Sequence, residues 1–383
     1  MSNDFIPFAI PDIGEEEIEA ATAAMRSGWL TTGPNAAAFE QEFARYIGAE
    51  HAVAVNSATA GLHLALESSG VGPGDEVIVP TWTFTATAEV VRYLGAEPVL
   101  VDVRADTLNI DLEAAERAVT PRTKAVMPVH FAGLPVDRLA LGDFAAKHSL
   151  LVIEDAAHTL PARSQGQMVG SGDSLATVFS FYATKTITTG EGGMVATPHE
   201  DVARRIRAMR LHGISRDVFD RYRSTKPAWF YEVVAPGYKY NLPDPAAAMG
   251  RVQLTRADSM RDRREALARG YDEAFAGLPI VRPAHAPADG QHSWHLYVCR
   301  LNEGSPARDE VIQALADRGV GTSVHFIPLH LHPYWREHCG VKPEDFPVAT
   351  EEFGKAFSLP LFSSMTTDQH RRVTESLHEV LAG

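Results

Sequence analysis

The stretch SFYATKTITTGEGGMVAT (residues 180–197) places one lysine, Lys185, between an apolar run and a glycine-rich turn. The run 178–182 has the β-branched and aromatic composition of a buried strand. The residues after Lys185 are small or hydroxylated and leave room beside it. A lone lysine is usually solvated, but at the edge of a low-dielectric cleft its charged form is disfavoured, and a neutral amine forms Schiff bases. The stretch therefore predicts a strand that ends in a reactive lysine.

Short apolar runs alternate with helical patterns through the first half of the chain. Continuous β-rich runs separated by helices are typical of a largely parallel sheet that is covered on both faces. We therefore expect an α/β fold with a mostly parallel central sheet. The expected strands lie at 51–56, 75–80, 98–103, 124–130, 151–158 and 175–185.

The pattern changes after about residue 200. Residues 214–242 read as a long irregular segment, and such a loop is usually functional or packs on a partner. The last part indicates a smaller α+β domain, so we expect a large domain at 1–250 and a small one at 251–383, with the boundary inside a long helix. The elements expected in the small domain are strands at 296–301 and 322–326 and helices at 308–319 and 367–382.

The composition bounds the possible functions. The chain has 383 residues, 45% of them hydrophobic and 22% charged, as in a soluble globular enzyme. A net charge of −14 disfavours nucleic-acid binding, which needs a basic surface. Two cysteines provide neither a disulfide framework nor a paired metal knuckle. Because we find no apolar run of ~18 residues and no signal-peptide pattern, we expect a cytoplasmic protein without membrane partners.

Two segments upstream carry groups that a reactive lysine could use. NSATAGLHLAL (56–66) follows a strand and begins a helix, and a helix N-terminus attracts anions, although an ordinary N-cap explains it equally. VIEDAAH (152–158) places Asp155 at the carboxyl end of an apolar strand, where open α/β sheets bind ligands. A helix cap would explain Asp155 alone, but not its pairing with Glu154 at the end of a buried run.

An anion cradle, a buried carboxylate and an amine are together what pyridoxal phosphate requires. Its phosphate needs a helix N-terminus, its aldehyde needs a lysine, and its ring nitrogen needs an acidic partner that keeps it protonated. PTWTFTATA (80–88) also supplies Trp82 and Phe84 as aromatic groups for the ring, with packing in the core as the alternative. The sequence therefore predicts a pyridoxal phosphate enzyme.

In this order, the segments resemble the sugar aminotransferases of the DegT/DnrJ/EryC1/StrS family, which have the fold-type-I architecture of pyridoxal phosphate enzymes. The resemblance covers almost the whole chain, and within the family it is strongest to the UDP-4-amino-4-deoxy-L-arabinose aminotransferases. Many members carry G-x-N-x-R where this chain has GYKYN (237–241), so the asparagine and the cation have exchanged places. The resemblance is carried by SGWLTTGP (27–34), NSATAGLHLAL, GPGDEVIVPTWTFTATA, PVHFAGLPVD (128–137), IEDAAH, FSFYATKTITTGEGG, GYKYNLPD (237–244) and RGVGTSVHF (318–326).

The resemblance implies a role for each matching residue. Lys185 would bind the cofactor aldehyde and shuttle the proton, and Asp155 would contact the pyridine nitrogen. His158 would lie near the phenolic oxygen of the ring, with Phe84 rather than Trp82 stacked on it. The phosphate contacts implied are Ala58, Thr59 and Ser180, with Lys239 or Asn241 reaching the partner's site in a homodimer that shares its active sites.

The resemblance also implies the reaction. The amino group would move from L-glutamate to a keto sugar carried on a nucleotide, with UDP and the 4-keto position taken from the most similar relatives, in polysaccharide biosynthesis or a related pathway. The candidates for the sugar side are Thr31, Gly33, Glu191 and His325, for which turn formation and packing are the alternatives.

Three other functions are weighed against this one. Some family members dehydrate the sugar and carry histidine in place of the lysine, so Lys185 argues against a dehydratase, whereas a 3-keto aminotransferase stays open. A metal hydrolase could be built on HFIPLHLHPYWREHC (325–339), which is rich in potential metal ligands, but the spacing fits no zinc signature and we expect no metal. A non-catalytic cofactor-binding regulator is the third alternative, and no helix-turn-helix signature supports DNA binding.

Overall fold

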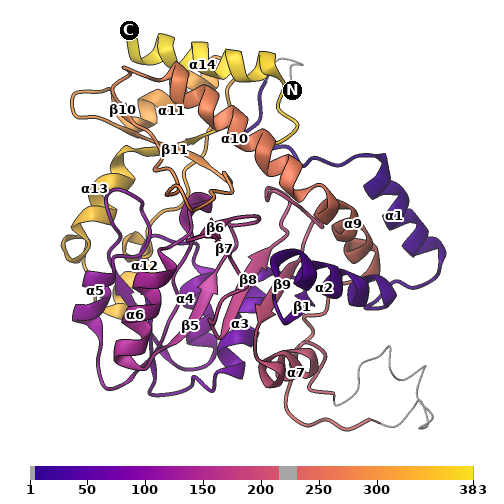
Figure 1. Cartoon of the computed structure of the whole chain (residues 1–383). Helices are drawn as coiled ribbons and strands as arrows, with labels where there is room; N and C mark the ends of the chain where they lie inside the picture. The colour runs from indigo at the N-terminus through magenta and orange to yellow at the C-terminus, as the bar shows by residue number, and fades with distance from the viewer. Residues whose placement is uncertain (1–4, 215–230, 383) are drawn as a thin grey trace.

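The computed structural model describes residues 5–214 and 231–382 (Figure 1). Its centre is a seven-stranded sheet in the order β1-β9-β8-β5-β4-β2-β3. β9 pairs antiparallel with both β1 and β8, and the remaining pairs are parallel, which confirms the mostly parallel sheet. The strands are β1 (His51–Val55), β2 (Glu76–Pro80), β3 (Glu97–Val101), β4 (Thr123–Val126), β5 (Leu151–Asp155), β8 (Ala176–Ser180) and β9 (Gly193–Thr197).

Helices cover both faces of this sheet. Successive side chains of a strand point to opposite faces, so Val53 and Val55 of β1 join one core cluster while Ala52 and Ala54 join another. Both sets are fully or almost fully buried, which explains why the strands read as continuous apolar runs. One face carries α3 (Ala58–Ser68), α4 (Ala86–Tyr93) and α7 (Glu200–Met209), and the other carries α2 (Pro34–Ile47), α5 (Leu112–Ala118) and α6 (Arg138–His148).

The C-terminal part forms a separate antiparallel sheet in the order β10-β11-β12. Its core cluster also contains Ile6, whose backbone N–H donates to Gly319. The remaining expected helices are present as α11 (Arg308–Asp317) and α14 (Thr367–Ala382). The three strands are β10 (Ile280–Val281), β11 (Tyr297–Leu301) and β12 (Ala356–Leu359).

Several expected boundaries are wrong. The strand expected at 175–185 ends at Ser180, and the one expected at 124–130 ends at Val126. No strand forms at 322–326, where Ser323 makes a single bridge to Ser358 and the chain turns toward a cavity. The long helix expected near residue 250 is two helices, α9 (Asp244–Thr255) and α10 (Ala257–Ala274). The domain boundary near 250 falls inside α9 and stays a prediction.

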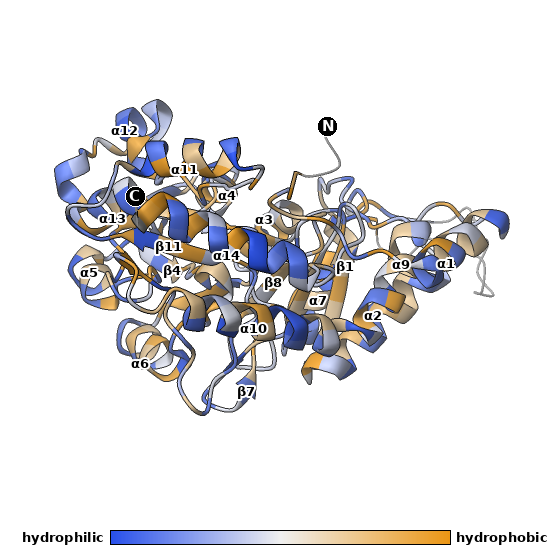
Figure 2. Ribbon diagram, turned by 90° about the horizontal axis from the view of Figure 1, so that it is seen from above, coloured by the Kyte–Doolittle hydropathy of each residue, from blue (hydrophilic) through white to orange (hydrophobic). Residues whose placement is uncertain are grey.

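The outer helices separate water from the core. In Figure 2, β1 is mostly orange, whereas α14 alternates between orange and blue, as expected for an amphipathic helix. α1 (Glu15–Arg26) lies beside α9 at one edge of the molecule in both views.

Over residues 5–214 and 231–382, no helix has the length and apolar character needed to span a bilayer. Part of the irregular segment expected at 214–242, residues 215–230, lies outside the described residues.

Candidate active site

The carboxyl ends of the parallel strands meet at one edge of the sheet, and a cavity of about 600 Å³ lies there. Ser57 follows β1, Thr83 follows β2, Asp155 ends β5 and Ser180 ends β8. Segments that flank the small antiparallel sheet close the cavity from the other side. The predicted site residues that line this cavity are Ala58, Thr59, Phe84, Asp155, His158, Ser180, Lys185, Glu191 and His325.

Asp155 is held in the floor of the cavity by two donors. The hydroxyl of Thr87 donates to Oδ2 at 2.8 Å, and the backbone N–H of Ala157 donates to Oδ1 at 3.1 Å. Burial raises the pKa of Asp155, while these hydrogen bonds and the charge of Lys185 oppose the rise. Residues 156–159 form a turn and not a helix, so the contact to Ala157 closes this turn, and the helix cap weighed as the alternative for Asp155 is wrong. Neighbouring Glu154 points elsewhere and contacts His130 at 2.9 Å.

Lys185 lies beyond the end of β8 rather than on the strand, in a turn closed by its own N–H donating to Tyr182. Its side chain is partly buried in the cavity wall. Burial lowers the pKa of Lys185 to about 8, although the charge of Asp155 raises it and Arg264 lowers it. A substantial fraction of the amine is therefore neutral near physiological pH and can act as a nucleophile or base.

The N-terminus of α3 opens into the cavity. Ser57 is the N-cap, and its hydroxyl accepts from the N–H of Ala60 at 3.1 Å. The N–H groups of Ala58 and Thr59 donate to no acceptor within the described parts of the chain. β9 passes close by, and a Cβ added at Gly193 would lie 2.8 Å from the carbonyl oxygen of Ser57. The free N–H groups and the helix dipole make this end of α3 suitable for an anion such as a phosphate.

Three histidines gather around Lys185. His158 and His295 have ring centroids 4.4 Å apart, and Nε2 of His295 lies 3.4 Å from the lysine amine. Burial lowers the pKa of His158 and of His295 well below the usual range, with the charge of Lys185 as the next cause. Burial likewise lowers the pKa of His325 to about 4. The three imidazoles are therefore neutral near pH 7, which limits the positive charge beside the lysine.

The two aromatic candidates take different places. Phe84 lines the cavity and is 54% exposed, with its ring 5.3 Å from that of Phe326. Trp82 is 1% exposed and packs on Phe131 in the core, with its indole N–H donating to the carbonyl of His325. Phe84 is therefore the one of the two that can contact a ligand in this cavity.

Four predicted site residues lie outside the cavity of their own chain. The amine of Lys239 donates to Oδ1 of Asn241 at 2.6 Å, and the amide of Asn241 lies 3.5 Å from the hydroxyl of Thr31. The N–H of Gly33 donates to Asp244 at 2.8 Å, at the start of α2. The structure thus groups Thr31, Gly33, Lys239 and Asn241 around a different point from Lys185.

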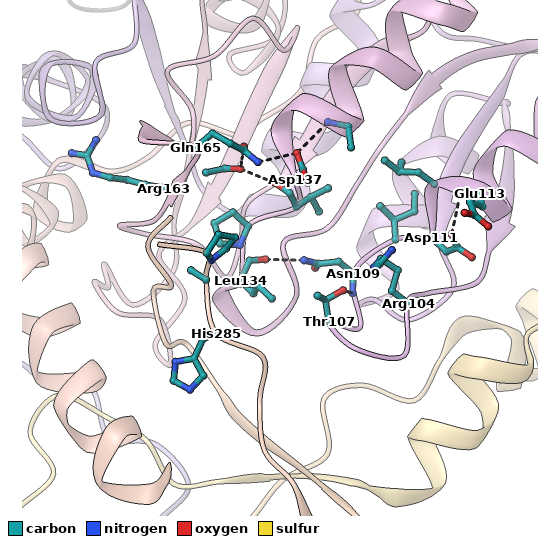
Figure 3. Close-up of a pocket in the computed structure, with 18 residues that line it drawn as sticks. Arg104, Thr107, Asn109, Asp111, Glu113, Leu134, Asp137, Arg163, Gln165 and His285 are labelled. Carbon is teal, nitrogen blue, oxygen red and sulfur yellow. Dashed lines mark hydrogen bonds between the residues drawn. The ribbon is translucent and has the colours of Figure 1, made fainter. Parts of the chain in front are cut away.

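A second cavity, of about 410 Å³, is shown in Figure 3. Polar side chains that line this cavity already form hydrogen bonds with other lining residues. Gln165 donates to Asp137 at 2.9 Å, and Asn109 donates to the carbonyl of Leu134 at 3.1 Å. None of the site residues predicted from the sequence is among the residues that line it. Across the described residues, no group of three or more His, Cys, Asp or Glu is arranged to hold a metal ion.

Two contacts of the site were missed by sequence reasoning. Thr87 lies three residues after Phe84, and only the folded chain shows that its hydroxyl reaches Asp155. His295 precedes β11, 110 residues from Lys185. The pair of histidines in HSWHLY (292–297) was the available signal, but nothing in it indicates which strand end it approaches.

The residues in the cavity fit pyridoxal phosphate. The free N–H groups of α3 suit its phosphate, and the partly buried amine of Lys185 suits its aldehyde. Asp155 is buried and electrostatically coupled to Lys185 in the same cavity, as a partner of the ring nitrogen must be.

Comparison with known proteins gives the same result. Spore coat polysaccharide biosynthesis protein SpsC of Bacillus subtilis is 48% identical in an alignment 385 positions long that covers 100% of this chain and 98% of that protein. Spr1654 of Streptococcus pneumoniae, solved in its PLP form, is 35% identical with a TM-score of 0.91 and 99% of each chain covered. The aminotransferase PseC of Helicobacter pylori, involved in the biosynthesis of pseudoaminic acid, is 28% identical with a TM-score of 0.90, covering 99% of this chain and 100% of that one.

The family description that matches residues 11–378 is the DegT/DnrJ/EryC1/StrS aminotransferase family. This match spans both sheets and every residue that lines the cavity except Phe8. The fold of the chain is the fold-type-I architecture expected from the sequence, with the central sheet followed by the small C-terminal sheet. The chain therefore belongs to the DegT/DnrJ/EryC1/StrS aminotransferase family and uses pyridoxal phosphate as its cofactor.

Proposed function

We propose that this protein transfers the amino group of L-glutamate to a keto sugar carried on a nucleotide, with UDP and a 4-keto position as the first candidates. The observation that carries the proposal is one cavity that combines the amine of Lys185, the carboxylate of Asp155 and the open N-terminus of α3. Membership of the family supports the aminotransferase chemistry. The descriptions of SpsC, as a spore coat polysaccharide biosynthesis protein, and of Spr1654, as a sugar aminotransferase, support a sugar as the acceptor.

Each residue has a proposed task in this chemistry. When bound, pyridoxal phosphate supplies an electron sink and carries the amino group between two half-reactions. Ala58 and Thr59 bind its phosphate through their free N–H groups. With the cofactor bound, Asp155 would hold its ring nitrogen in the protonated form, and Lys185 would hold its aldehyde. As a free amine, Lys185 would take the proton from the α-carbon of the donor, a transfer that needs a neutral amine close to that carbon.

The sugar side uses Glu191 and His325, which line the same cavity as the N-terminus of α3. A cavity of about 600 Å³ is within the usual range for small-molecule sites. Overall, glutamate and the keto sugar are converted to 2-oxoglutarate and the amino sugar, so the nitrogen and its two electrons are conserved.

Thr31, Gly33, Lys239 and Asn241 act, in this proposal, on the cavity of a second subunit. They cluster together through contacts such as that of Asn241 to Thr31, and none of them lines the cavity of their own chain. A homodimer with shared active sites would give them a ligand to bind. We place this dimer in the cytoplasm, where nucleotide-linked sugars are made.

The alternatives keep the cofactor and differ in the sugar or in the reaction. A 3-keto sugar would use the same groups, and the similarity to the arabinose enzymes stays a prediction because the relatives described above carry other names. A dehydratase or a non-catalytic regulator would leave the amine of Lys185 without its proposed task as a base for transamination.

The test is incubation of the purified protein with L-glutamate and a panel of UDP- and dTDP-linked 3-keto and 4-keto sugars. Mass spectrometry of the sugar and an enzymatic assay of 2-oxoglutarate read out both products. We expect equal amounts of amino sugar and 2-oxoglutarate from one member of the panel. The variant Lys185→Ala should form neither, while Lys355→Ala, a lysine paired with Glu351 on the surface, should match the unmodified protein. Formation of 2-oxoglutarate without any amino sugar would contradict the proposed acceptor.

A further inference from the structure

The amine of Lys185 has one side-chain contact that the proposed mechanism does not use. It lies 3.4 Å from Nε2 of His295, and no other hydrogen bond to this amine occurs among the residues that the structure describes. His295 is 5% exposed and comes from the segment just before β11, so it approaches Lys185 from the small-domain side of the cavity.

The backbone on both sides of His295 is firmly held. Arg264 on α10 is 2% exposed, and its Nη1 donates to the carbonyls of Trp294 at 3.3 Å, His295 at 3.4 Å and Leu361 at 2.7 Å. Trp294 has a φ of 54°, in the left-handed region that a bulky residue rarely adopts. Strained backbone of this kind persists where the surroundings determine it, and it is concentrated at functional sites.

The same segment is tied to the other side of the cavity. The hydroxyl of Ser293 donates to the carbonyl of His158 at 2.6 Å, and the N–H of Leu296 donates to the carbonyl of Ala132 at 3.1 Å. The ring of His295 in turn packs on the ring of His158. The imidazole therefore has little freedom to move away from the lysine.

The direction of the hydrogen bond between Lys185 and His295 determines the tautomer of the imidazole. If Nε2 accepts from the lysine amine, the proton of the neutral ring is on Nδ1. Nδ1 is buried and has no partner among the described residues. A buried polar atom without a partner costs free energy, so packing alone would favour an apolar residue at this position.

We propose that His295 is a positioning residue for Lys185: its Nε2 accepts a hydrogen bond from the amine and holds the amine in the cavity whenever the lysine is not bound to the cofactor. The lysine is free in this way after the amino donor has displaced it, which is when it must move a proton. Neutral imidazole can accept this bond, whereas a charged one would repel the amine. The other charged or titratable groups around Lys185 are Asp155, His158, Arg264 and His325.

Two amide variants separate this role from packing. In His295→Gln, the side-chain oxygen can reach the place of Nε2, whereas in His295→Asn it reaches only the place of Nδ1. Both variants keep a polar side chain of similar chemistry, so a loss of packing would affect both. The first readout needs neither cofactor nor activity: the pH midpoint at which an amine-reactive reagent modifies Lys185 in the apoprotein, followed by the mass of its peptide.

A hydrogen bond to the ammonium form stabilises that form. We therefore expect the midpoint to fall in His295→Asn and to return toward the unmodified value in His295→Gln. The second readout is the single-turnover rate with L-glutamate, which rests on the proposed function. It should fall about ten-fold in His295→Asn, the effect of one hydrogen bond, with KM unchanged, and recover in His295→Gln.

Equal midpoints in the two variants, whether shifted or unshifted, would overturn the proposal. The same holds if His295→Gln is the more strongly affected of the two. If the unmodified protein does not react with L-glutamate at all, the proposed donor fails, but the midpoints of the apoprotein still decide the role of His295.

Discussion

The hydroxyl of Thr87 donates a 2.8 Å hydrogen bond to Oδ2 of Asp155 at the floor of the cavity. Thr87 is fully buried, and its hydroxyl also lies 2.8 Å from that of Thr83, which lines the cavity. The carboxylate of Asp155, which the sequence analysis predicted as a site residue, is thus oriented by Thr87. Thr87 belongs to the same segment, 80–88, as Phe84. Orientation matters because the remaining lone pairs of Asp155 are then free for a ligand.

Removing this donor should slow the reaction while leaving the fold intact. Thr87→Val keeps the shape of the side chain but leaves Oδ2 without its partner, and we expect the first half-reaction with L-glutamate to slow about ten-fold. Asp155→Asn should slow it by about a hundred- to a thousand-fold, because it removes the charge itself. Stopped-flow absorbance measures both rates. Thr87→Ser, which keeps the hydroxyl, is the control, and a Thr87→Val rate equal to the unmodified one would show that the hydrogen bond has no such role.

The pH dependence of cofactor binding should report the pKa of Lys185. The amine is charged below its pKa and neutral above it, so the rate at which the apoprotein captures pyridoxal phosphate should rise with pH around a midpoint of about 8. The charge of Asp155 raises the pKa of Lys185, so the midpoint should move to lower pH in Asp155→Asn. Absorbance after rapid mixing at constant ionic strength gives the rates. A midpoint near 10.5, the ordinary value for lysine, would mean that burial does not act on this amine.

The close approach of β9 to α3 gives a prediction about the phosphate site. In Gly193→Ala, the new Cβ would lie within 3 Å of backbone atoms of Ser57 and Ala58, so the start of α3 must shift. We expect a loss of ~1–3 kcal/mol in the free energy of unfolding and weaker binding of pyridoxal phosphate. Urea unfolding and cofactor titration measure these. Gly142→Ala is the matched control, since nothing lies within 4 Å of a Cβ there in α6, and it should stabilise the protein slightly. Unchanged cofactor affinity in Gly193→Ala would contradict an anion site at this helix end.

The shared-site proposal predicts complementation between inactive variants. Lys185→Ala lacks the amine, and a double variant with Lys239→Ala and Asn241→Ala lacks the residues proposed to reach the partner's cavity. In mixed dimers, one cavity would combine the intact contributions of both subunits. We expect each variant to be inactive alone and their co-expressed mixture to regain part of the activity. A double variant that keeps full activity alone, or a mixture that stays inactive, would contradict a site built from two subunits.

Much of the fold could be predicted because the buried strands are short apolar runs whose two faces both join the core, as β1 does through Val53 and Ala54. The strand expected at 322–326 does not form although the segment has strand-like composition, because Ser323, His325 and Phe326 line the cavity instead of joining the sheet. Asp155 was found because a carboxylate at the end of an apolar strand is unusual.

His295 and Thr87 escaped prediction for a different reason. Their side chains are ordinary in sequence, and their roles depend on contacts made only in the folded chain: His295 meets Lys185 across 110 residues, held by the buried Arg264. The positions of Lys239 and Asn241 relative to a partner subunit likewise depend on an arrangement of two chains, which one sequence does not display.

The most direct test of the account is an absorbance spectrum of the purified protein with pyridoxal phosphate, recorded before and after addition of L-glutamate, beside the same spectra of Lys185→Ala. The account predicts a visible band from cofactor bound to Lys185, which L-glutamate shifts to the near-ultraviolet as 2-oxoglutarate forms. In Lys185→Ala, the lysine-dependent band and the formation of 2-oxoglutarate should both be lost. A protein that shows no visible band with added cofactor, or a Lys185→Ala variant that still converts L-glutamate, would contradict the central role of Lys185.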